Sequence, residues 1–136
     1  MKIMLKNNDL GIMILRVALG MLMLLHGIAK IKHGTGFIEG VFEQNGLPKF
    51  LAYLVYLGEI IAPLMLIVGF RTRLASILLG GTMVVVVITA AMDKIGKLTE
   101  VGAWALEVQA LFFFGALALF FTGGGKFAAS TKNNWD

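Results

Sequence analysis

Four side chains that could carry chemistry occur in stretches that are otherwise apolar enough to cross a membrane: Arg16, His26, Glu59 and Glu107. A charged group at the centre of a bilayer costs about 2.5–3.5 kcal/mol even on a lenient insertion scale. We therefore expect these side chains to face the protein interior, a water-filled cavity or each other. Carboxylates and a histidine gathered in one low-dielectric pocket could exchange protons or bind the oxygens of a polar ligand.

Helical spacing places an aromatic residue beside each carboxylate. Tyr56 lies one turn before Glu59, and Trp104 lies one turn before Glu107. The spacing predicts a polar pocket in which His26, Glu59 and Glu107 bind a ligand or relay protons. Trp104 and Tyr56 would form its edge.

A buried charge needs a partner wherever it lies, so the sequence also predicts an ion pair between Arg16 and Glu59. A purely structural interpretation stays open for the whole cluster. Under that interpretation the histidine is a packing residue, and the two aromatic residues mark the membrane interface or fill space.

The residue types limit the cofactors that the chain can hold by itself. There is no cysteine, which excludes disulfides, thiol redox motifs and iron–sulfur ligation. No Glu-x-x-His pair occurs, so we expect no metal site of the di-metal carboxylate type. We expect no intrinsic cofactor, and a quinone is the one redox ligand that the predicted pocket suggests.

The elements that must position these residues follow from composition. The 136 residues are 58% hydrophobic and 15% charged, with a mean hydropathy of +0.85. Soluble domains are about 45–50% apolar and about 25% charged. The sequence predicts a single all-α integral membrane domain over 1–136, an antiparallel four-helix bundle with spans at about 10–31, 49–70, 74–92 and 101–122.

The connection between the first two spans has an amphipathic pattern. Four large apolar residues recur there at helical spacing: Phe37, Ile38, Val41 and Phe42. This pattern predicts a short interfacial helix, with Asn45-Gly46 as its stop signal and Pro48 at the start of the next helix. We expect the polar tail, 126–136, to be peripheral.

The basic residues are typical of membrane topology markers. The net charge is +4, but no basic run exists that could follow a nucleic acid backbone, so we expect no nucleic acid partner. Slightly more basic residues lie on the side of the termini, which favours two cytoplasmic termini in a bacterial inner membrane. The lipid bilayer is then the first partner.

Six short motifs occur in an order that resembles the DoxX family of small four-helix membrane proteins, from about Leu10 to Gly125. They are Leu15-Arg16, His26-Gly27 followed by Lys30, Gly46-Leu47-Pro48, Gly58-Glu59, Arg71-Thr72-Arg73 and the acidic position of Glu107. The resemblance implies similarity to the membrane subunit of thiosulfate:quinone oxidoreductase, and some members are linked to oxidative-stress complexes. Arg16, His26, Glu59 and Arg73 match its recurring polar pattern.

The functional prediction is a membrane subunit of an oxidoreductase system, with a quinone-binding or proton-relay pocket and a soluble or membrane oxidoreductase as partner. The sequence shows no independent catalytic motif. Two alternatives stay open. One is a non-catalytic scaffold that anchors a partner enzyme. The other is a small-solute transporter, for which four helices per chain would require a homo-oligomer.

Overall fold

A computed structural model describes residues 6–136, and the elements it contains are helical. They are α1 (Asn8–His33), α2 (Gly36–Gln44), the 3₁₀ helix η1 (Lys49–Leu54), the π-helix η2 (Leu57–Ile61), α3 (Ala62–Val68), α4 (Thr72–Ala90), the 3₁₀ helix η3 (Met92–Lys94) and α5 (Glu107–Thr122). Within residues 6–136 the extended structure is limited to an isolated bridge between Leu98 and Trp104. The predicted all-α class is confirmed.

Three helical stretches are long and apolar enough to cross a membrane: Asn8–His33, Lys49–Val68 and Thr72–Ala90, with hydropathies of 2.1, 2.1 and 2.0. α5 is apolar but has 16 residues, which span about 24 Å. It begins at Glu107 and not at residue 101, where the sequence placed the start of a fourth span. Gly102 has φ +83°, and Ala105 N donates to Lys97 O at 3.0 Å, so residues 101–106 form a folded-back turn.

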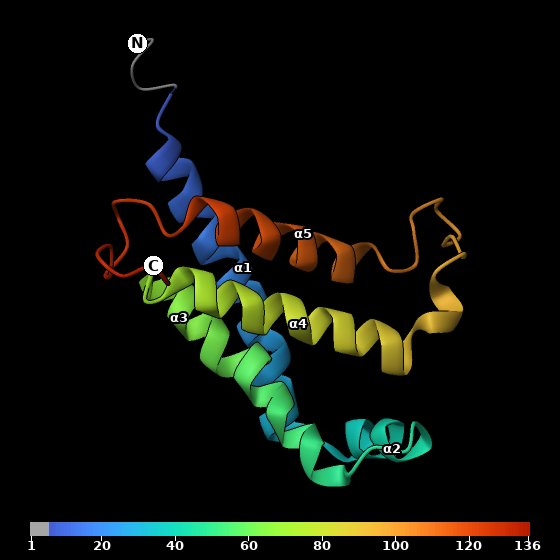
Figure 1. Cartoon of the computed structure of the whole chain (residues 1–136). Coiled ribbons are helices and arrows are strands. Elements are labelled where there is room, and N and C mark those ends of the chain that lie inside the picture. Colours follow the sequence, from blue (N-terminus) through green and yellow to red (C-terminus); the bar gives the residue numbers. More distant parts are fainter. Residues whose placement is uncertain (1–5) are drawn as a thin grey trace.

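The helices form two antiparallel pairs (Figure 1). α1 runs beside η2 and α3, and α4 runs beside α5. The pairs meet near the turn between α3 and α4 and diverge toward their other ends, and α2 lies beneath the far end of the first pair. The apolar core lies where the pairs meet, and Leu66, Leu79 and Leu119 in it are completely buried.

Glycines set the distance between α1 and its antiparallel neighbour. An ideal Cβ on Gly27 would lie 2.2 Å from Glu59 O, and one on Gly20 would lie 2.8 Å from Pro63 O. The two glycines are seven residues apart and therefore share one helix face. Only a residue without a side chain permits this approach of two backbones, as at other close helix contacts in membranes.

Pro63 explains why the second helical stretch changes its winding. A proline inside a helix has no N–H to donate, and its ring clashes with the carbonyl four residues earlier, which here belongs to Glu59. The backbone widens just before it into the π-helix Leu57–Ile61, where Ala62 N donates to Leu57 O. Such π segments are rare and occur frequently at functional sites.

The predicted interfacial helix is present as α2. It ends at Gln44, directly before Asn45-Gly46, and Pro48 precedes η1 as expected. The Asn45 side chain donates to Val41 O at 2.8 Å and to Thr89 O at 3.1 Å. The residue that ends α2 therefore also ties it to the end of α4.

The C-terminal tail is not peripheral, which corrects the expectation from its polarity. Ala129 N donates to Val68 O at 3.2 Å, and Ser130 N donates to Gly69 O at 3.1 Å. Lys126 N donates to Asp9 Oδ1 at 3.0 Å, so the tail also reaches the first turn of α1. A helix ends with carbonyls that have no partner in the helix, and the tail supplies donors for those of α3.

Candidate functional site

The buried carboxylate of Glu59 forms an ion pair with Lys30. Its side chain is 4% exposed, whereas the lysine side chain is 25% exposed. Tyr56 Oη donates to the backbone carbonyl of Lys30 at 3.3 Å. Glu59 and Tyr56 thus both bond to Lys30, and the cation beside Glu59 is Lys30 and not Arg16.

Local geometry explains why these two charges meet. Lys30 lies three residues after Gly27 on α1, hence on the same helix face. Gly27 lies against the backbone of Glu59, so the lysine one turn further on can reach the carboxylate. Gly58, next to Glu59, faces the other way, and an ideal Cβ there would overlap Thr82 Oγ1 of α4. Glu59 is therefore held between α1 and α4.

The ion pair lies at the edge of a cavity of about 400 Å³. The cavity walls come from α2, η1, η2 and α4, where the two helix pairs diverge (Figure 1). Four of its residues are the amphipathic face that the sequence predicted for α2: Phe37, Ile38, Val41 and Phe42. Lys30 and Glu59 are the ionisable residues among its walls within the described chain.

The arrangement can bind a mostly apolar molecule that carries a polar end. Small-molecule sites are commonly cavities of about 300–1,000 Å³ with apolar walls and a few polar groups that orient the ligand. An ammonium donates hydrogen bonds, and a carboxylate accepts them. Because Lys30 is partly exposed, it can exchange Glu59 for another acceptor while keeping its charge solvated at the polar end of the cavity.

Arg16 is buried elsewhere, and the predicted ion pair with Glu59 is wrong. Its Nη1 donates to Leu66 O at 2.7 Å and to Ile67 O at 2.8 Å, and its Nη2 donates to Phe127 O at 3.3 Å. The reason is helix register. Gly27 is level with Glu59, and Arg16 lies eleven residues earlier on α1, or about 16 Å along the axis.

The guanidinium acts instead as a cap for the C-terminal end of α3. Free carbonyls at a helix end carry partial negative charge, and arginine donates to them well. Arg16 donates hydrogen bonds to two of these carbonyls, and backbone N–H groups of the tail donate to the carbonyls of Val68 and Gly69. Arg16 is 1% exposed, and its Nε has no hydrogen-bond partner within residues 6–136.

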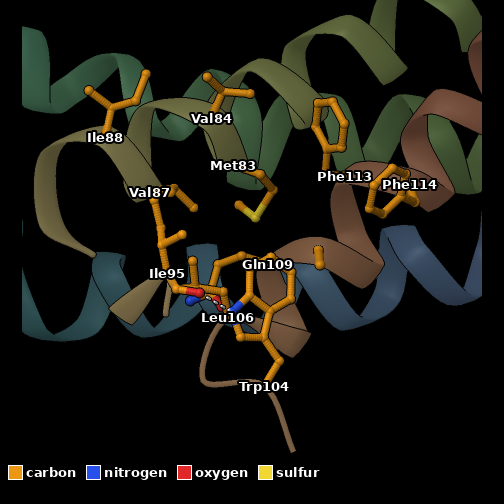
Figure 2. Close-up of a pocket in the computed structure, with 11 residues that line it drawn as sticks. Met83, Val84, Val87, Ile88, Ile95, Trp104, Leu106, Gln109, Phe113 and Phe114 are labelled. Carbon is orange, nitrogen blue, oxygen red and sulfur yellow. Dashed lines mark hydrogen bonds between the residues drawn. The ribbon is translucent and has the colours of Figure 1, made fainter. Parts of the chain in front are cut away.

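Trp104 lines a different and more apolar pocket of about 280 Å³ (Figure 2). This pocket lies between the second half of α4, the following loop and the start of α5, and it contains Met83, Val87 and Phe113. Trp104 Nε1 donates to Ile95 O at 2.7 Å, as the dashed line in Figure 2 marks. The indole therefore fixes a loop and does not reach Glu59.

His26 and Glu107 also lie outside the Glu59 cavity. His26 is exposed, and its ring meets that of Phe112 of α5 edge to face at 6.0 Å. Glu107 is the exposed first residue of α5, where a carboxylate favours the positive end of the helix dipole. The single pocket predicted from His26, Glu59, Glu107, Trp104 and Tyr56 is thus divided over three places.

Sequence reasoning named Lys30 only as part of a motif and did not include it among the predicted site residues. Its position near the end of the first span is typical of a topology marker. The signal that could have found it is the glycine one turn earlier, since Gly27 indicates which face of α1 approaches its neighbour. Across the described residues, no group of three or more histidine, cysteine, aspartate or glutamate side chains could hold a metal ion.

Comparison with known proteins agrees with this architecture. The chain is 32% identical over 87 residues to the "Putative oxidoreductase CatD" of Bacillus subtilis (strain 168), and the match covers 64% of this chain and 64% of that relative. No solved structure matches. The DoxX family model matches residues 11–92, a range that includes Arg16, Lys30, Glu59 and the α2 helix. The chain therefore belongs to the DoxX family.

Proposed function

We propose that this protein is the membrane subunit of an oxidoreductase system and that it binds a quinone in the cavity beside Lys30 and Glu59. The observation that carries the proposal is the buried carboxylate, paired with a partly exposed lysine, at the edge of an apolar cavity of about 400 Å³. A quinone has the matching chemistry, namely an apolar body with two carbonyl oxygens that accept hydrogen bonds.

Three groups have defined roles in this proposal. Lys30 Nζ donates a hydrogen bond to a ligand oxygen and keeps its positive charge beside it. Glu59 takes up a proton from water and passes it to an oxygen of the reduced quinone, as a positioned carboxyl group does in general acid–base catalysis. The apolar walls from α2 and α4 exclude water from the ring. A bound quinone supplies the redox chemistry, which none of these side chains possesses.

The electrons come from a partner in this scheme. The chain has no cysteine with which to form a thiol redox pair or an iron–sulfur site. The relative in Bacillus subtilis is named as an oxidoreductase, and that name supports a redox setting for this chain. A soluble or membrane-bound oxidoreductase subunit would therefore deliver electrons to the ligand held beside Lys30.

The orientation in the membrane completes the proposal. The start of α1 and the C-terminal tail lie at one end of the molecule, since Lys126 N donates to Asp9 Oδ1. Arg71, Arg73 and Lys126 lie at the same end, which favours a cytoplasmic location for it in a bacterial inner membrane. The quinone cavity would then open in the outer half of the bilayer.

Titration of the purified protein with soluble ubiquinone and menaquinone analogues tests this function. We expect saturable binding that Lys30→Gln weakens about tenfold, the effect of losing one charge-assisted hydrogen bond. Glu107→Gln and His26→Ala are matched controls, because both residues lie outside the cavity, and we expect less than twofold change.

Two outcomes would contradict the proposal. The first is a lack of saturable binding by the wild-type protein, and the second is equal binding by wild type and Lys30→Gln. If a partner enzyme is recovered from native membranes equally well with both variants while no quinone binds, the chain is a scaffold and the cavity is structural.

A further inference from the structure

A second cavity, of different chemistry, lies at the opposite end of the molecule. It has a volume of about 360 Å³ and is enclosed by the start of α4, the turn after α5 and the folded-back tail. Its walls include two basic side chains, Arg73 and Lys126, and the hydroxyls of Ser130 and Thr131. Glycines 123–125 form one wall and bring backbone in place of side chains.

The guanidinium of Arg73 has unused hydrogen-bonding capacity at this cavity. Its Nε is buried, and it has no hydrogen-bond partner within residues 6–136. The group passes close to the glycine turn, since an ideal Cβ on Gly123 would lie 3.6 Å from Arg73 Nε. A buried donor without a partner is unfavourable, so a ligand that accepts from it is favoured.

The acidic residue in the cavity wall does not use this donor. Asp136 Oδ1 accepts from Arg71 Nη1 at 3.0 Å, and its Oδ2 accepts from Asn133 N at 2.6 Å. Burial raises the pKa of Asp136, but these hydrogen bonds, a further one with Ser130 and the charge of Arg71 outweigh burial and lower it. The carboxylate is therefore ionised and neutralised by Arg71, while Arg73 and Lys126 keep their positive charge.

Lys126 is also available to a ligand. Its Nζ lies 4.0 Å from Asp9 Oδ2, and the lysine side chain is 68% exposed. Exposed pairs of this kind contribute little to stability and break easily. The cavity thus presents a fork-shaped guanidinium, an exposed ammonium and the hydroxyl of Thr131, which are donors that recognise tetrahedral oxyanions.

We propose that this cavity binds a phosphate group between Arg73, Lys126 and the hydroxyl of Thr131. The phosphate belongs either to a soluble anion or to the headgroup of an anionic phospholipid, because both present the same oxygens. The site is independent of the quinone cavity, which lies at the other end of the helices.

Calorimetric titration of the purified protein with inorganic phosphate at constant ionic strength tests the soluble source. Native mass spectrometry in micelles that contain phosphatidylglycerol tests the lipid source. For whichever of the two ligands binds, we expect Arg73→Gln to weaken binding about tenfold or more and Arg73→Lys to weaken it less. Lys94→Gln, which removes an exposed cation at the other end, is the matched control with less than twofold change. Glu59→Gln is expected to leave phosphate binding unchanged.

A measurement on the wild-type protein covers the case in which Arg73→Gln does not fold. Phosphate or phosphatidylglycerol should slow the modification of Arg73 by phenylglyoxal, as measured by peptide mass spectrometry. Binding of phosphate or of phosphatidylglycerol that depends on Arg73 supports the proposal and shows which of the two molecules supplies the phosphate group. Absence of binding of both molecules, equal binding by Arg73→Gln and Lys94→Gln, or unchanged labelling of Arg73 overturns it.

Discussion

Arg16 and Glu59 are both buried charges in helical stretches long enough to cross a membrane, yet their surroundings differ. Arg16 donates to three backbone carbonyls from α3 and the tail. Glu59 has one side-chain partner, the partly exposed Lys30, and its carboxylate lies at the edge of a cavity. Backbone carbonyls cannot leave without unfolding a helix end, whereas a lysine side chain can rotate. Burial of a charge therefore indicates a binding site only where the partner can be exchanged.

Replacement of Arg16 should give the largest effect. Arg16→Leu removes the donors for Leu66 O and Ile67 O and releases Phe127 O, so we expect a loss of about 3–5 kcal/mol in stability. Unfolding in mixed micelles measures the free energy. Arg16→Lys should recover only part of it, because one ammonium cannot replace a planar fork. A change below 1 kcal/mol for Arg16→Leu would show that this charge is not a structural cap.

Removal of Lys30 should cost less than removal of Arg16 but more than removal of its partner. Lys30→Met leaves a buried carboxylate without its cation, for an expected cost of about 2–3 kcal/mol. Glu59→Gln leaves a lysine that can extend into water, so its cost should be smaller. A double-mutant cycle for Lys30→Met and Glu59→Gln measures their coupling. Additive effects would contradict the pairing of these side chains.

The third-largest effect on stability is expected from a change at Gly27, whose contact positions Glu59. A Cβ on Gly27 would overlap Glu59 O, so Gly27→Ala should destabilise by about 1–3 kcal/mol and weaken quinone binding. Gly11→Ala is the control in the same helix, since nothing lies within 4 Å of a Cβ there. The control should stabilise by about 0.5–1 kcal/mol, because alanine favours the helix. Equal effects of the two variants would argue against close packing at Gly27.

The smallest effect concerns the tail that helps to bury Arg16. The pKa of Asp136 is lowered, because its hydrogen bonds and Arg71 outweigh burial. Its stabilisation of the tail is therefore complete above the unfolded-state pKa of about 3.9 and is lost as the pH falls through the lower folded value. Asp136→Asn should speed amide exchange of Ala129 and Ser130 at neutral pH. At a pH below the folded value the variant and the wild type should exchange alike.

Much of the fold was predictable from local signals. The hydropathy pattern gave the long helices, and the spacing of Phe37, Ile38, Val41 and Phe42 gave both α2 and the face that lines the cavity. Asn45-Gly46 and Pro48 marked its end correctly. These features depend on neighbouring residues in the chain, so they can be recognised without knowledge of other helices.

The site was predicted only in part. Tyr56 bonds to the backbone of Lys30, the partner of Glu59, but Trp104, His26 and Glu107 lie elsewhere. Depth along a helix limits which side chains can share a level, but it does not give the direction in which each one points. His26 is one residue before Gly27, and that rotation of about 100° turns it from Glu59 toward α5.

The sequence by itself determined that the chain is helical and apolar, that few charges lie inside its long helices, and where α2 ends. Tertiary structure alone decided the partners of those charges. The contact between Gly27 and Glu59 sets the register of α1, places Lys30 beside the carboxylate and moves Arg16 about 16 Å away to the end of α3. Pairing of charges depends on distances between helices, and backbone contacts far apart in the chain set those distances.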